Sequence, residues 1–167
     1  DSDGTGNILT GPGIADGLYY LDTRHLSSLS LSIAGQPPIL LSATLRENNA
    51  TLSCDLTNPD LVLDGRKVDH DLLHVRRTLF LRQQTSFERI QVRNYDVEER
   101  TLTVEIRFAA DFVDLFEVRG TPRAKHGQMR PAAIDGDTVL LGYEGLDERL
   151  RTTRLRFAPM PDRITAD

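Results

Sequence analysis

The chain has 167 residues, with 20 Lys plus Arg against 25 Asp plus Glu, so its formal net charge is −5 at neutral pH. A chain of this length predicts one domain, with a core large enough to fold without a disulfide or a structural metal. The acidic balance argues against nucleic acid as a partner, and the apolar runs are far shorter than the roughly 20 residues that cross a bilayer, so no membrane partner is expected.

Apolar residues recur with period two along most of the chain, which is the pattern of half-buried β-strands. In chain order, we expect strands at 28–33, 39–45, 50–56, 72–82, 87–94, 101–108, 138–143 and 152–157. Separations of about 10 to 15 residues, with hairpin-like turns, favour an antiparallel sandwich over a parallel α/β sheet. The expected fold class is therefore all-β, an antiparallel two-sheet sandwich.

Two segments depart from this alternation. The stretch 110–117 carries Phe112, Leu115 and Phe116 at a spacing that fits one face of a helical turn, so at most one short helix is expected there. The stretch 121–137 is rich in Pro, Gly, Lys and Arg, which predicts an exposed, mobile connection. Within the strand 72–82, Arg77 falls on the apolar face, and a buried arginine requires a partner.

The search for catalytic and metal-binding motifs gives little. Cys54 is the one cysteine, so no internal disulfide forms. The first residues of the sequence do not combine basic residues with an apolar run, as a secretory signal does, and this favours a cytoplasmic protein. His70 and His74 lie four residues apart, but no second group of metal ligands accompanies them. Phosphate loops and nucleophile motifs are absent from the sequence. We expect no catalytic residue, no metal and no cofactor in this chain.

A polar cluster follows the apolar run at 18–21. On a strand, Asp22 and Arg24 would share a face, where they could pair with each other or with Arg77 and Glu88 across the sheet. The alternative is that Arg24 and His25 border a ligand or partner surface, because guanidinium and imidazole groups offer directional hydrogen bonds. Arg119, which follows the expected helix, is a second candidate of the same kind. The candidate substrate or interface residues are therefore Asp22, Arg24, His25 and Arg119.

Five segments of the chain, at 17–27, 35–42, 49–60, 87–90 and 110–120, stand in an order and spacing that indicate a family. Together they resemble the N-terminal domain of bacterial glycogen debranching enzymes of the amylo-alpha-1,6-glucosidase type. The resemblance covers nearly the whole chain and implies a β-sandwich related to the large "supersandwich" domains that precede helical barrels in glycoside hydrolases. It also implies that the catalytic carboxylates lie on such a barrel, so no catalytic residue is carried over to this chain.

The resemblance implies further strands beyond both ends, so we expect one β-sandwich domain, 1–167, excised from a longer glycoside hydrolase and trimmed at both ends. Unpaired strand edges left by trimming predict self-association. The preferred function is a non-catalytic domain that supports and frames its partner, the helical catalytic domain. Two alternatives stay open: a stand-alone α-glucan-binding module that uses the edge 19–25, and an intrinsic hydrolase with two carboxylates in one pocket.

Overall fold

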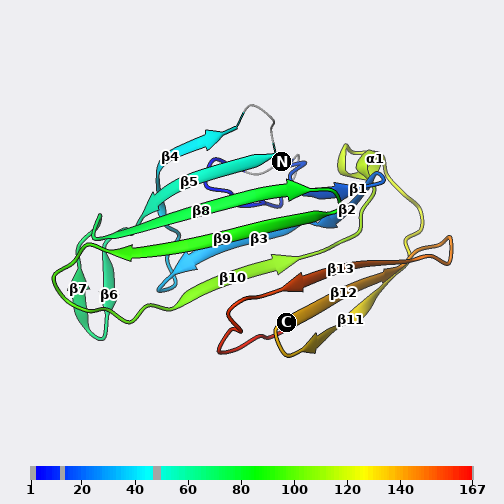
Figure 1. Cartoon of the computed structure of the whole chain (residues 1–167). Helices are drawn as coiled ribbons and strands as arrows, with labels where there is room; N and C mark the ends of the chain where they lie inside the picture. The colour runs from blue at the N-terminus through cyan, green and yellow to red at the C-terminus, as the bar shows by residue number, and fades with distance from the viewer. Residues whose placement is uncertain (1–2, 12–13, 47–49, 167) are drawn as a thin grey trace. The chain divides into compact units, whose positions relative to one another are not determined.

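The computed structural model describes residues 3–11, 14–46 and 50–166, which form two compact units. Unit 1 contains the described parts of 1–9 and 28–108, and unit 2 contains those of 10–27 and 109–167. The described residues form thirteen strands and one four-residue helix (Figure 1), and the strand pairs with an assigned register are antiparallel. This confirms the predicted all-β class with one short helix.

Unit 1 is built on a four-stranded antiparallel sheet in the order β4-β5-β8-β9. Its strands are β4 (Ile39–Leu45), β5 (Thr51–Thr57), β8 (Leu73–Arg82) and β9 (Thr85–Asn94). Two strand pairs accompany it: β3 (Ser28–Ile33) with β10 (Val104–Ala109), and β6 (Leu61–Leu63) with β7 (Arg66–Val68).

The core of unit 1 lies between one face of the four-stranded sheet and these two pairs. It consists of Leu31, Ile33, Cys54, Leu56, Leu61, Val68, Leu73 and Val75. These residues alternate along their strands because successive side chains of a strand point to opposite faces. The alternation expected for 28–33, 50–56 and 72–82 is thus confirmed, and Cys54 is a buried apolar residue of this core.

One buried charge lies at the edge of this core. The Arg77 side chain is 1% exposed, and its Nε donates to Glu88 Oε1 at 2.5 Å. Its Nη1 donates to Asn7 Oδ1 at 2.7 Å and to the Thr5 carbonyl oxygen at 3.2 Å. Glu88 is therefore the partner that the sequence predicts for a buried Arg77. Glu88 lies on β9 opposite Leu79, which is two residues after Arg77 on β8, so both charged side chains are on the core face.

Unit 2 contains a three-stranded antiparallel sheet, a hairpin and a short helix. The sheet is formed by β11 (Gln128–Asp135), β12 (Thr138–Glu144) and β13 (Leu150–Arg156), and the hairpin by β1 (Leu18–Tyr20) and β2 (Thr23–Leu26). The helix is α1 (Leu115–Val118). Among the described residues, no helix has the length and apolar character needed to cross a bilayer.

Strand β11 corrects the expectation of a mobile connection at 121–137. Residues 128–135 pair with β12, and the ladder is irregular between Arg130 and Ala133, where Pro131 lies. A proline is tolerated at such a point because it lies on an edge strand and its missing N–H is not needed by the ladder. The proline and the charged residues concealed the strand pattern in the sequence.

Candidate functional site

The two-residue turn between β1 and β2 has an unusual backbone. Tyr20 pairs with Thr23 across it, and the turn residues Leu21 and Asp22 have φ values of 47° and 61°. Such turns favour Asn-Gly because both positions need a positive φ, and a leucine in this region costs on the order of 1–3 kcal/mol. The Leu115 N–H donates to the Asp22 carbonyl oxygen at 2.8 Å, which anchors the turn on the start of α1.

Arg24 of β2 is buried and paired with a carboxylate. Its Nε and Nη2 donate to the two carboxylate oxygens of Asp111 at 3.2 and 2.5 Å, and its Nη1 donates to the Asp16 carbonyl oxygen at 3.3 Å. Burial is the largest single influence and works against the charge, but the hydrogen bond and negative charge of Asp111, together with Tyr19, outweigh it, so the pKa of Arg24 is raised. The partner is not Asp22, because that residue lies in the turn and does not continue the strand alternation. The Arg24 guanidinium is therefore bonded within unit 2.

His25 is half-buried in an aromatic environment. Its ring lies edge-on to Phe112, with centroids 5.3 Å apart, and edge-on to Tyr20 at 6.2 Å. Its Nδ1 is 3.3 Å from the Thr152 carbonyl oxygen, and the Thr153 hydroxyl donates to the His25 carbonyl oxygen at 2.6 Å. These contacts fix β2 to β13 and leave His25 little freedom to act on a ligand.

The environment of His25 predicts a pH-dependent stability. Burial lowers its pKa, the Thr152 hydrogen bond partly opposes this, and the positive charge of Arg151 adds to the lowering. In the unfolded chain His25 takes up its proton near pH 6.5, whereas the folded chain does so only at lower pH. The stability contributed by neutral His25 is therefore complete above pH 6.5 and is lost as the pH falls towards the folded-state pKa.

We expect the urea midpoint of the native chain to fall more steeply between about pH 7.5 and 5.5 than that of a His25→Gln variant, because glutamine does not titrate. The comparison removes the contributions of other titrating groups, since both proteins share them. Equal pH slopes in the two proteins would contradict this assignment.

Asp114 and Arg119 define the two ends of α1. The Asp114 carboxylate caps the helix by accepting the Phe116 N–H at 2.9 Å, and it also pairs with Arg123. The Arg119 N–H donates to the Leu115 carbonyl oxygen at 3.2 Å. The Arg119 residue is exposed, and the described part of the chain gives its side chain no ion pair, so it remains an accessible candidate.

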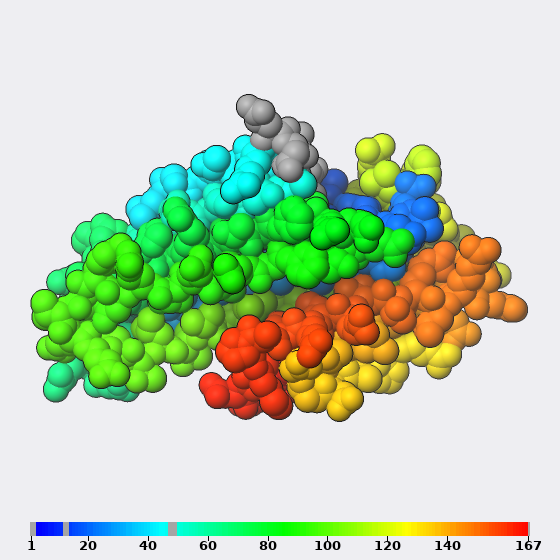
Figure 2. All heavy atoms as spheres, viewed as in Figure 1, coloured from blue at the N-terminus to red at the C-terminus, as the bar shows by residue number. Residues whose placement is uncertain are grey.

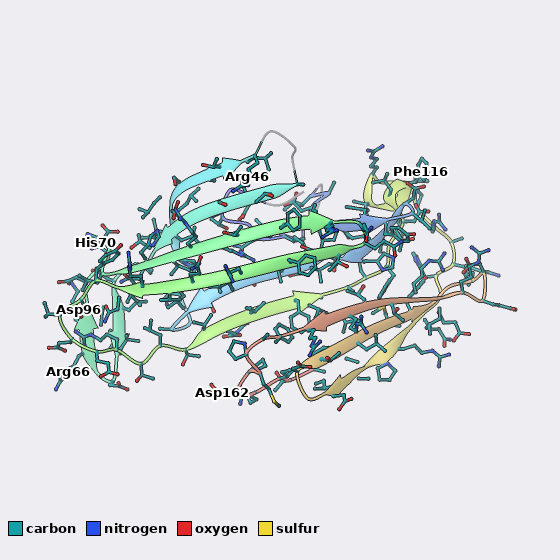
Figure 3. The ribbon with its side chains drawn as sticks, viewed as in Figure 1. Arg46, Arg66, His70, Asp96, Phe116 and Asp162 are labelled. Carbon is teal, nitrogen blue, oxygen red and sulfur yellow. The ribbon has the colours of Figure 1, made fainter. Side chains whose placement is uncertain are left out.

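Three large apolar side chains are exposed around this turn and helix. Leu21 is 79% exposed, Phe116 60% and Tyr20 43%. The hydrogen bond from the Leu115 N–H to the Asp22 carbonyl oxygen holds the turn beside the helix. Phe116 is the next residue of α1, and Figure 3 shows it at the surface of the helix. We call Tyr20, Leu21 and Phe116 the hairpin patch.

Sequence reasoning missed this patch because it placed Phe116 on the same helical face as Phe112. In the structure Phe112 is 4% exposed and lies before the helix, with a positive φ of 53°, and its ring stacks on Tyr143 with centroids 5.7 Å apart. Of the four predicted candidates, Asp22 and Arg119 lie next to α1, whereas Arg24 is paired with Asp111 and His25 contacts Phe112 and β13. The signal that could have identified Leu21 is a leucine where a two-residue hairpin turn favours asparagine or glycine.

The two histidines noted in the sequence bind different carboxylates. His70 Nδ1 lies 3.0 Å from Asp60, and His74 Nε2 lies 2.8 Å from Asp55. Within the described ranges, no three His, Cys, Asp or Glu side chains gather in an arrangement that could hold a metal ion.

Comparison with known proteins gives one match. Residues 2–167 match the model of a family described as the N-terminal domain of (some) glycogen debranching enzymes. No curated protein and no solved structure gives a significant match.

Proposed function

Since the chain belongs to the family of N-terminal domains of some glycogen debranching enzymes, we propose that it is a non-catalytic domain that supports and frames a helical catalytic domain. The parent enzyme would be a glycoside hydrolase that acts on a branched α-glucan. In this proposal the chain contributes a rigid surface that packs against the catalytic domain, and the reacting carboxylates belong to that partner.

The hairpin patch is the observation that carries the proposal. Apolar side chains that are exposed together mark surfaces that partners cover. Leu21 adds a second argument, because its left-handed backbone and its 79% exposure both cost free energy in the isolated chain. A partner that buries the leucine offsets these costs, and full burial of one such side chain is worth roughly 1.5–3 kcal/mol.

The rigidity of the patch also favours a docking role. The Leu115 hydrogen bond to Asp22 fixes the turn, and the Asp114 cap fixes the helix that presents Phe116. A fixed apolar side chain loses little conformational entropy when it binds, so such residues are effective anchors.

A Leu21→Asn variant separates stability from binding. Asparagine tolerates a positive φ, so we expect the free energy of unfolding to rise by about 1 kcal/mol. We also expect affinity for the separately produced catalytic domain to fall at least tenfold, because the apolar contact is lost. Urea denaturation measures the first effect and isothermal titration calorimetry the second.

Leu146→Asn is the matched control, because Leu146 is 63% exposed in unit 2 outside the hairpin patch. It should leave the affinity for the catalytic domain unchanged. The proposed docking surface is wrong if Leu21→Asn binds the catalytic domain as tightly as the native chain, or if Leu146→Asn weakens binding to the same extent.

A further inference from the structure

The four-stranded sheet of unit 1 has a second face, opposite the core, which we call the polar face. Cross-strand partners share a face, so the register assigns its members. They include Ser42 and Thr44 from β4, Ser53 and Asp55 from β5, His74, Arg76, Thr78 and Phe80 from β8, and Phe87, Arg89, Gln91 and Arg93 from β9. In Figure 2 the side of β8 and β9 that faces the viewer is not covered by any other element of unit 1.

The acceptor at the centre of the polar face is Asp55. Its Oδ1 accepts from Arg76 Nε at 2.9 Å and lies 2.8 Å from His74 Nε2, and its Oδ2 accepts from Arg76 Nη2 at 3.2 Å. The Arg76 hydrogen bond is the main cause that lowers the pKa of Asp55, so the carboxylate is ionised at neutral pH. The three side chains form a preorganised set of donors and acceptors.

A shallow depression lies beside this set, lined by His74, Arg76, Gln91, Val92 and Arg93. The described residues give the side chain of Gln91 neither a hydrogen bond nor an ion pair, although an amide offers both donors and an acceptor. Hydrogen-bonding capacity is thus available at the middle of the depression.

An exposed aromatic ring borders the depression. Tyr95 is 60% exposed, and its N–H donates to the Leu72 carbonyl oxygen at 2.8 Å, which fixes the residue at the end of β9. Arg93 approaches its ring, with Cζ 5.7 Å from the centroid, and the His74 ring lies 6.5 Å away. At the other end of the face, the exposed rings of Phe80 and Phe87 stack with centroids 6.3 Å apart.

These features fit a polyhydroxylated chain. A pyranose ring presents apolar C–H groups to an aromatic ring and hydroxyl groups to planar polar side chains, and the polar face offers both. Phe80 lies six positions after His74 on β8, and at about 3.4 Å per position the face is about 20 Å long, which suits several linked sugar units. The surface mixes acceptors with donors, as hydroxyl recognition requires, because each hydroxyl group both donates and accepts.

We propose that the depression formed by His74, Arg76, Gln91 and Arg93, with Tyr95 as a stacking platform, binds a chain of α-linked glucose units. The identity of the sugar rests on the proposed function, in which the parent enzyme acts on an α-glucan. The location differs from the edge at 19–25 where the sequence placed a glycan surface. Such a site holds a branch of the polymer on the supporting domain while another part of the same polymer is processed.

The test is a titration of the ¹⁵N-labelled full chain with maltoheptaose, followed by two-dimensional NMR. We expect the largest amide shifts at residues of β8, β9 and Tyr95. Tyr95→Ala should raise the Kd at least tenfold and Gln91→Ala severalfold, whereas Tyr95→Phe, which keeps the ring, should stay within about twofold of the native chain.

Gln128→Ala, which matches Gln91→Ala, and Leu146→Asn are the controls, because both remove an exposed side chain of unit 2 outside the hairpin patch. Neither should change the Kd. The assignment is overturned by an absence of shifts, by shifts confined to unit 2, or by a response to sodium sulfate with none to maltoheptaose, which would make the face an anion site. The titration uses this chain alone, so its result is independent of whether the catalytic domain binds the hairpin patch.

Discussion

Glu88→Ala is expected to lower the free energy of unfolding by about 3–5 kcal/mol, since it leaves the charge of a buried arginine without its partner. The Arg77 side chain is 1% exposed, and its only carboxylate contact among the described residues is Glu88, at 2.5 Å. The hydrogen bonds from Arg77 to Asn7 and to the Thr5 carbonyl oxygen remain, but neither supplies a negative charge. Urea denaturation followed by circular dichroism measures the loss.

Two further variants separate the charge effect from lost packing. The double variant Arg77→Met, Glu88→Leu removes both charges and keeps apolar volume, so it should recover most of the stability. Glu105→Ala removes one partner of an exposed ion pair, Arg107–Glu105, and should cost no more than about 1 kcal/mol. A Glu88→Ala loss as small as that of Glu105→Ala would show that Arg77 does not depend on its carboxylate.

Strands β3, β5 and β8 were predictable because one face of each meets a core. In β3 the buried residues Leu29, Leu31 and Ile33 alternate with half-buried serines, so period two is visible in the sequence. The turn at Ala34 and Gly35 was predictable as well, since both residues have a positive φ and glycine favours it.

Short strands escaped prediction for lack of periodicity. β6 and β7 have three residues each and are joined by Asp64-Gly65, with φ values of 50° and 75°. Three residues are too few to establish an alternation, but Asp-Gly is a strong hairpin signal and marks this turn. β11 escaped for a different reason, because Pro131 and the neighbouring charges resemble a loop although they lie on an edge strand.

The contacts of the candidate residues could not be predicted from the sequence. The Leu115 N–H donates to the Asp22 carbonyl oxygen, and the carboxylate that pairs with Arg24 belongs to Asp111, which is 87 residues away in sequence. A pairing at that separation depends on the tertiary fold, and the alternation of one strand carries no information about it. Of the two roles that the sequence leaves open for Arg24, the bidentate pair with Asp111 favours the structural ion pair, because most of the guanidinium is occupied within the chain.

Asp111→Ala is the second substitution for which we expect a large effect, a loss of about 2–3 kcal/mol. The Arg24 side chain is 11% exposed and donates to both carboxylate oxygens of Asp111, so alanine leaves a nearly buried charge with the Asp16 carbonyl oxygen and Tyr19 but without a carboxylate. The expected loss is smaller than that for Glu88→Ala because Asp111 is 32% exposed and water can replace part of its contribution. Urea denaturation gives the magnitude.

Hydrogen exchange locates the effect of this substitution. The Arg24 N–H donates to the Val113 carbonyl oxygen at 2.8 Å, so the strand that carries Arg24 and the segment that carries Asp111 are joined through both backbone and side chain. Loss of the ion pair should therefore speed amide exchange at 18–26 and 109–120 and leave unit 1 unchanged.

Asp114→Ala is the control, because it removes the cap of α1 and a partly exposed ion pair with Arg123 and should cost about 1 kcal/mol. If Asp111→Ala costs no more than this, the ion pair does not hold the hairpin against the helix. A larger, localised loss would mean that the buried pair fixes the base of the hairpin whose tip carries Leu21. The affinity of Asp111→Ala for the catalytic domain should then fall although no residue of the hairpin patch has changed, because a docking residue on a loosened hairpin must be ordered again on binding.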